Sequence, residues 1–165
     1  MSGNVLVAGI GNIFLGDDAF GVEVLNRLAQ RTLPEGVKAV DYGIRSYDLA
    51  YALMEEWELV ILVDALPRGG EPGTLYVLEP KLPEGEEAPP SLDAHTMNPF
   101  AVLQLVSALG GKVGRMLVVG CEPGRLEPDA EGNIGLSEPV SAALDEAVHM
   151  VEELISKASN RVSAA

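Results

Sequence analysis

Cysteine, basic residues and long apolar runs are all scarce in this chain of 165 residues. Its single cysteine, Cys121, excludes an internal disulfide framework and a cysteine-rich zinc site, and it fits a reducing compartment. The 11 Lys and Arg residues face 25 Asp and Glu residues, and the resulting net charge of -14 would repel nucleic acid and acidic membrane surfaces. No apolar run approaches the roughly 20 residues that span a bilayer. We therefore expect a cytoplasmic protein that binds neither nucleic acid nor membranes.

Strand-like and helix-like segments alternate along the chain, which is typical of α/β folds. Buried strands are predicted at residues 5–8, 37–41, 59–63 and 116–120. Helices are predicted at residues 19–31, 47–56 and 98–109, and from residue 137 onward. Residues 74–78 form a further strand after a link too short for a crossover helix, so this strand should run antiparallel. Residues 81–91, rich in proline and glutamate, predict a surface loop within one domain that spans residues 1–165.

Two acidic residues, Asp17 and Asp18, follow the first predicted strand and a glycine-bracketed turn. The carboxyl end of a parallel strand is where open α/β sheets bind ligands. A phosphate site would offer bare backbone N–H groups there, whereas carboxylates suit a cation. The two acids also fit a helix cap and a first-turn acid favoured by the helix dipole, and we expect one of them to be the cap.

Two further polar residues are candidates for the same cation site. Asp64 ends the third predicted strand, and carboxyl ends of parallel strands share one edge, so Asp64 should lie near Asp18. His95 precedes the helix at residues 98–109 and reaches this edge if its loop folds back. An acid after a strand can also cap a turn, and a loop histidine can be solvated. Two carboxylates and one imidazole are nevertheless a known ligand set for a divalent transition metal with open coordination positions.

The remaining candidates are weaker. Cys121 ends a strand near the same edge, so a thiol nucleophile paired with His95 is conceivable, although a small buried apolar residue is the preferred interpretation. His149 has acidic neighbours at helical spacings of three and four, which indicates a solvated ion-pair face rather than a ligand.

The segment at residues 9–21 reads Gly-x-Gly-Asn, then three apolar residues, a glycine and two acids. A final glycine follows the second acid after two intervening residues. This opening resembles that of the hydrogenase maturation endopeptidases, which trim the C-terminal tail of the large subunit of nickel-iron hydrogenases. Five further segments resemble one branch of that family in the same order. They are Asp41-Tyr42-Gly43-Ile44-Arg45, Val63-Asp64-Ala65, Pro72-Gly73-Thr74-Leu75-Tyr76, Asp93-Ala94-His95 and Val119-Gly120-Cys121-Glu122-Pro123.

This resemblance implies a three-layer α/β/α sandwich with a mixed, mostly parallel five-stranded sheet in which one strand is antiparallel. It implies an endopeptidase that removes the C-terminal extension of a nickel-loaded large-subunit precursor. Asp18, Asp64 and His95 match the positions with which the family grips nickel already inserted in the precursor. Nickel would then arrive with the substrate, and we expect no organic cofactor. Three ligands leave coordination positions for the substrate's cysteine thiolates.

The chain departs from the family pattern at two places. Asp18 stands where many members have the longer Glu. Many members carry Gly-Thr where this chain has Gly43, Ile44 and Arg45. We predict that Gly43 and Arg45 contact the substrate, with Arg45 binding a carbonyl or carboxylate, or else pairing with Asp48.

The nucleophile is not assigned from the sequence. The family is often classed with aspartic peptidases, yet adjacent Asp17 and Asp18 would diverge on a helix rather than share a proton. Water attack on a scissile carbonyl polarised by the metal is the favoured chemistry. One alternative is a non-enzymatic nickel-sensing chaperone of the hydrogenase subunit. A peptidyl-tRNA hydrolase-like enzyme is disfavoured, because the chain lacks an early histidine and a basic face.

Overall fold

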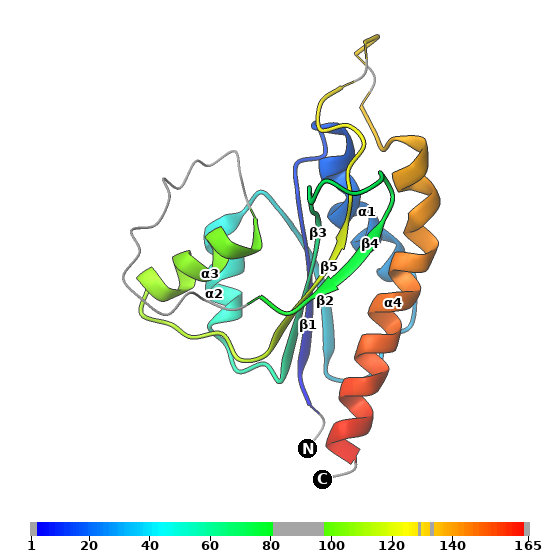
Figure 1. The fold of residues 1–165 in the computed structure, drawn as a ribbon. Helices are drawn as coiled ribbons and strands as arrows, with labels where there is room; N and C mark the ends of the chain where they lie inside the picture. Colours follow the sequence, from blue (N-terminus) through cyan, green and yellow to red (C-terminus); the bar gives the residue numbers. More distant parts are fainter. Residues whose placement is uncertain (1–2, 81–97, 129, 133, 164–165) are drawn as a thin grey trace.

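The computed structural model describes residues 3–80, 98–128, 130–132 and 134–163, and its strands form one five-stranded sheet (Figure 1). The spatial order is β2-β1-β3-β5-β4. The first four of these strands are mutually parallel, whereas β4 runs antiparallel to β5. The strands are β1 (Val5–Ile10), β2 (Val37–Gly43), β3 (Leu59–Ala65), β4 (Leu75–Leu78) and β5 (Met116–Cys121).

Helices cover both faces of the sheet. They are the short 3-10 helix η1 (Gly16–Ala19), α1 (Phe20–Leu28), α2 (Ser46–Leu53), α3 (Pro99–Ala108) and α4 (Glu138–Ser163). The pair α1 and α4 packs on one face and the pair α2 and α3 on the other (Figure 1). The predicted three-layer fold with one antiparallel strand is confirmed. Among the described residues, no helix has the length and apolar character to cross a membrane. The surface loop predicted at residues 81–91 lies outside the described residues.

The first two predicted helices are shorter than the sequence pattern suggested. After α1, the Gln30 N–H donates to the Arg27 carbonyl at 3.2 Å, and after α2 the Met54 N–H donates to the Tyr51 carbonyl at 3.2 Å. These bonds reach back three residues rather than four, so both helices tighten and end earlier. The predicted start of α3 is confirmed: the Asn98 side chain accepts a bond from the Ala101 N–H at 2.9 Å.

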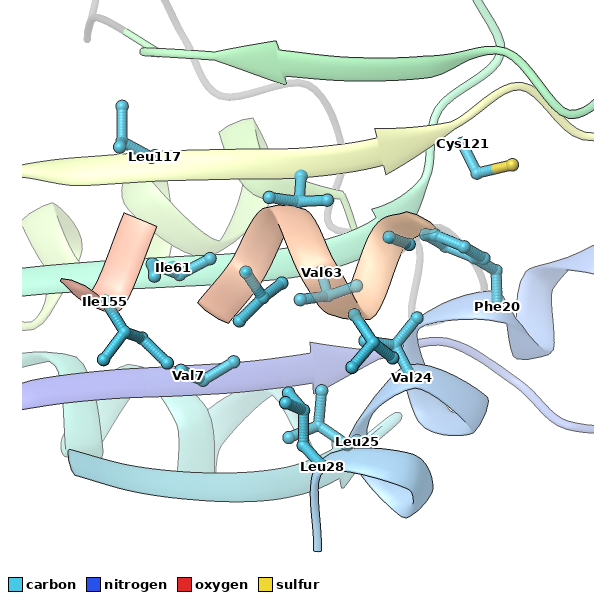
Figure 2. Close-up of a cluster of buried hydrophobic side chains, with 14 of the residues drawn as sticks. Val7, Phe20, Val24, Leu25, Leu28, Ile61, Val63, Leu117, Cys121 and Ile155 are labelled. Carbon is cyan, nitrogen blue, oxygen red and sulfur yellow. The ribbon is translucent and has the colours of Figure 1, made fainter. Parts of the chain in front are cut away.

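Apolar side chains alternate across the sheet and build a core on each face. Val7 and Ile61 belong to the cluster beneath α1 and α4, whereas Leu6 belongs to the cluster beneath α2 and α3. Figure 2 shows the first cluster, in which Phe20 packs at the start of α1 without solvent exposure. Each fully buried aliphatic or aromatic side chain contributes about 1.5–3 kcal/mol. These two cores fix the strands whose carboxyl ends carry the candidate site.

The glycines of the segment at residues 9–21 let α1 approach the sheet closely. A Cβ on Gly21 would lie 2.2 Å from the Val63 carbonyl oxygen and 2.4 Å from that of Ile10. A Cβ on Gly11, whose φ is 139°, would lie 1.9 Å from the backbone oxygen of Asp18. No other residue fits such contacts. The glycines therefore serve packing and hold Asp18 against the carboxyl edge of the sheet.

Candidate functional site

Asp64 is the centre of the candidate site. It lies one residue before the end of β3, only 2% exposed, and its side chain points to the same face as Leu62, toward the layer of α2 and α3. Within the described part of the chain, its Oδ1 has no hydrogen-bond partner. Burial and then the nearby charge of Asp18 raise the pKa of Asp64 well above its ordinary value. A buried carboxylate without a positive partner favours a proton or a cation.

Asp18 is the second acid of this site, on η1. Its Oδ2 accepts a bond from the Asn12 N–H at 2.7 Å, which fixes the side chain beside the end of β1. Burial raises the pKa of Asp18, and the bond from Asn12 partly opposes the rise. Both acids thus hold protons more readily than free carboxylates. The charge of Asp18 reaches Asp64, so the two acids lie within electrostatic range of each other, and their role as metal ligands stays a prediction.

Asp17 does not have the role that the sequence suggested. One of the two acids was expected to cap a helix, but neither the Asp17 nor the Asp18 side chain caps η1 or α1. Asp17 is fully buried and accepts bonds from the N–H groups of Gly124 and Arg125, both at 2.7 Å. It also accepts from the N–H and the hydroxyl of Ser137, at 2.6 and 2.7 Å. These donors lie at the two ends of the connection between β5 and α4. The prediction of a cap is therefore wrong, since Asp17 clamps a distant loop.

Glu122 is a buried acid that the sequence reasoning did not single out. It is 3% exposed, and it accepts bonds from the N–H groups of Arg68 at 3.0 Å and Gly70 at 2.5 Å and from the Tyr76 hydroxyl at 3.2 Å. Burial alone would raise the pKa of Glu122, but these bonds outweigh burial and lower it. The signal that could have revealed it is an acid directly after an apolar strand, together with the Gly69-Gly70 turn whose N–H groups need an acceptor. Glu122 shapes the loop that leaves β3 after Asp64.

Gly43 and Arg45 lie where β2 ends. Gly43 has a φ of 55°, and its carbonyl accepts a bond from the Gly11 N–H at 3.0 Å, which joins β2 to the first glycine turn. The Arg45 guanidinium donates to the Asp41 carbonyl at 2.5 Å and lies 3.6 Å from the Asp48 carboxylate. The pairing with Asp48 is thus present. A role for Gly43 and Arg45 in substrate binding stays a prediction.

His95 lies outside the described residues, so only two of the three predicted ligands can be placed. Across the described ranges, no group of three His, Cys, Asp or Glu side chains is arranged to hold a metal ion. His149 lies 3.3 Å from Glu153 on the exposed face of α4, which confirms the predicted ion-pair face.

Cys121 is a packing residue. It is fully buried in the cluster beneath α1 and α4 (Figure 2). Cys121 pairs with Ala65, the neighbour of Asp64 on β3, so its side chain lies on the opposite face of the sheet from Asp64. Burial first, and then the charges of Asp17 and Glu122, raise the pKa of the thiol to about 12. At neutral pH the sulfur therefore stays protonated and is a poor nucleophile. The preferred interpretation of a small buried apolar residue is confirmed.

Comparisons with known proteins agree on one family. A family model described as hydrogenase maturation protease matches residues 22–154. The hydrogenase 2 maturation protease of Escherichia coli is 31% identical over 153 residues, which cover 89% of this chain and 87% of that protein. The coenzyme F420 hydrogenase subunit delta of Methanothermobacter thermautotrophicus is 32% identical over 154 residues, covering 89% of this chain and 91% of that protein. The solved structure of the hydrogenase maturating endopeptidase HybD from E. coli superposes with a TM-score of 0.71 and 30% identity, covering 93% of each chain.

Proposed function

The chain belongs to the hydrogenase maturation protease family and is a hydrolase, and from this premise we propose that it removes the C-terminal extension of a nickel-loaded large-subunit precursor of a nickel-iron hydrogenase. In this proposal the nickel belongs to the substrate. Asp18, Asp64 and His95 recognise it. The protein then cuts only a precursor that already carries its metal.

The observation that carries the proposal is the carboxylate oxygen of Asp64 that has no hydrogen-bond partner in the described part of the chain. A buried Oδ1 without a hydrogen bond, beside a second carboxylate on Asp18, is costly unless a cation or a proton is present. Carboxylate oxygens suit divalent cations, and an added imidazole from His95 would shift the preference toward transition metals such as nickel. The described part of the donor set therefore fits the proposed metal.

The same geometry supports a substrate-borne rather than a resident metal. Two carboxylates and one histidine leave positions open on a divalent ion. The precursor's own thiolates would fill those positions, so the complete ligand set forms only in the complex. A precursor without nickel would leave Asp18 and Asp64 unpaired, and the cost of that burial disfavours the productive complex.

A thiol mechanism is disfavoured for the cleavage step. Cys121 has a pKa raised to about 12 and lies on the face of the sheet opposite Asp64. We propose instead that water attacks a scissile carbonyl polarised by the nickel. Gly43 is the last residue of β2, and Arg45 follows it at the same edge of the sheet. Both would contact the backbone of the precursor segment that is cut.

The test is incubation of the purified protein with nickel-loaded and nickel-free precursor, followed by mass measurement of any released C-terminal peptide. We expect release from the loaded precursor only. Asp64→Asn should abolish release, whereas the matched control Asp145→Asn, on an α4 side chain that is 87% exposed, should leave it intact. Release from the nickel-free precursor at an equal rate would contradict the proposal.

The same experiment separates the non-enzymatic alternative. A nickel-sensing chaperone would bind the loaded precursor more tightly than the nickel-free form and release no peptide. Tight binding with an uncut precursor mass would therefore replace the protease proposal with the chaperone.

A further inference from the structure

Large apolar side chains are exposed mainly at the edge of the sheet that carries Asp18 and Asp64. Nine large apolar side chains are exposed among the described residues. Six of them lie in the segments that follow the carboxyl ends of β1, β2 and β5: Ile13, Phe14, Ile44, Tyr47, Leu126 and Ile134. We call these six the apolar rim. Apolar side chains gathered on one edge of a protein mark a contact surface.

Two residues of the apolar rim lie on a loop whose ends are anchored by hydrogen bonds. The connection between β5 and α4 extends beyond the carboxyl ends of the strands (Figure 1). It carries Leu126 and Ile134, which are 43% and 56% exposed. Its two ends meet at the Asp17 carboxylate, through Gly124 and Ser137. These bonds anchor the two ends of the loop, which lowers part of the entropic cost of ordering it against a partner.

The position of the acids indicates what this surface binds. Asp64 is 2% exposed, so a partner that carries a cation to it would cover the edge of the sheet. The partner must therefore present a cationic centre surrounded by apolar surface. Apolar contacts around a desolvated polar centre are the usual anatomy of a specific interface.

We propose that the apolar rim docks the folded large-subunit precursor whether or not nickel is present, and that Asp18 and Asp64 alone distinguish the loaded from the nickel-free form. This inference rests on the proposed function for the identity of the partner. It divides recognition into two parts, with affinity from the rim and selectivity from the acids. Nickel-free precursor should then bind the protein without being cut.

The test compares rim variants with a matched control. Phe14→Ser and Ile134→Ser replace rim side chains that are 61% and 56% exposed, so neither removes core packing. The control variant is Val77→Ser, which replaces an apolar residue that is 44% exposed on the edge strand β4 and is not part of the apolar rim. For each variant, KM and kcat are measured with loaded precursor, and Kd is measured with nickel-free precursor by calorimetry.

We expect the double variant Phe14→Ser/Ile134→Ser to raise both KM and the Kd of nickel-free precursor by about tenfold or more, as loss of two interface anchors does. Its kcat should stay within about twofold, because the acids are intact. Val77→Ser should match the unmodified protein. Asp64→Asn should abolish cleavage and should not weaken the binding of nickel-free precursor.

Three outcomes would overturn the inference. The rim variants could leave KM and Kd unchanged, they could lower kcat alone, or Asp64→Asn could weaken binding of nickel-free precursor as much as the rim variants do. Failure of the proposed function gives a different result, namely a nickel-loaded precursor that binds through the rim and is never cut.

Discussion

Replacing Asp17 by alanine should destabilise the protein far more than replacing its neighbour Asp18. Asp17→Ala removes four hydrogen bonds to a fully buried carboxylate, from the N–H groups of Gly124, Arg125 and Ser137 and from the Ser137 hydroxyl. Asp18 accepts one hydrogen bond from the described residues, from the Asn12 N–H. The two changes remove the same chemical group from adjacent positions, so their difference isolates the effect of the clamp.

The magnitude follows from the donors left without an acceptor. A hydrogen bond to a charged group contributes about 1.5–3 kcal/mol, and four such bonds would sum to roughly 6–12 kcal/mol if they were additive. Removing the acid also recovers its cost of burial, and water can enter the space. Breaking buried polar networks of this kind costs about 3–5 kcal/mol, and we expect that loss for Asp17→Ala. Asp18→Ala should cost less than about 1 kcal/mol, because it also relieves the repulsion with Asp64.

Urea unfolding, followed by far-ultraviolet circular dichroism and by fluorescence of the single tryptophan, Trp57, measures both losses. The Trp57 ring N–H donates to the Ala52 carbonyl at 2.7 Å, so its signal reports on the end of α2, away from the substituted residues. A loss below about 1 kcal/mol for Asp17→Ala would refute the clamp. Equal losses for the two variants would refute the division of roles between the adjacent acids.

Three further predictions concern the site. Burial raises the pKa of both Asp18 and Asp64, and the charge of Asp18 adds to the rise at Asp64. Their contribution to stability is therefore fully present below the ordinary carboxyl range and is lost as pH rises through the raised values. Asp64→Asn should raise the free energy of unfolding at pH 7 and not at low pH, and a variant less stable at every pH would contradict this. Cys121→Ala should lose about 1–2 kcal/mol and still cleave loaded precursor, whereas a fall in rate of several orders of magnitude would restore a thiol mechanism. The free protein should lose nickel on dialysis against a chelator, because its ligand set is open; a stoichiometric metal that survives dialysis, measured by mass spectrometry, would indicate a resident ion instead.

The strands were predictable because the signals that specify them are local. The continuous apolar run at residues 59–63 has to be buried on both faces, and only a central parallel strand provides that. The direction of β4 followed from a link too short for a crossover helix. Asn98 followed by Pro99 specified the start of α3 within four residues of chain. Each signal lies inside the element that it specifies or directly beside it.

The roles of the buried acids could not be predicted, because their partners lie far away in the chain. The donors to Asp17 are 107 to 120 residues distant, and those to Glu122 are 46 to 54 residues distant. The sequence around Asp17 predicts a helix cap, because an acid just before a helix often caps it. Only the fold brings Gly124 and Ser137 to it. The clamp and the Glu122 loop are thus products of topology rather than of motif.

The turn Gly16–Ala19 explains how adjacent acids acquire separate roles. Residues of a 3-10 helix follow one another at three per turn, so consecutive side chains leave the axis in different directions. Asp17 therefore enters the protein toward the connection between β5 and α4, while Asp18 lies beside Asp64 at the carboxyl edge. The short helix η1 thus positions two parts of the proposed binding surface. They are the loop that carries Leu126 and Ile134, and Asp18, which would bind the metal. Because the two are tied to the same turn, a partner seated on the loop meets the acids at a fixed position, and a shift of η1 would disturb docking and metal recognition together.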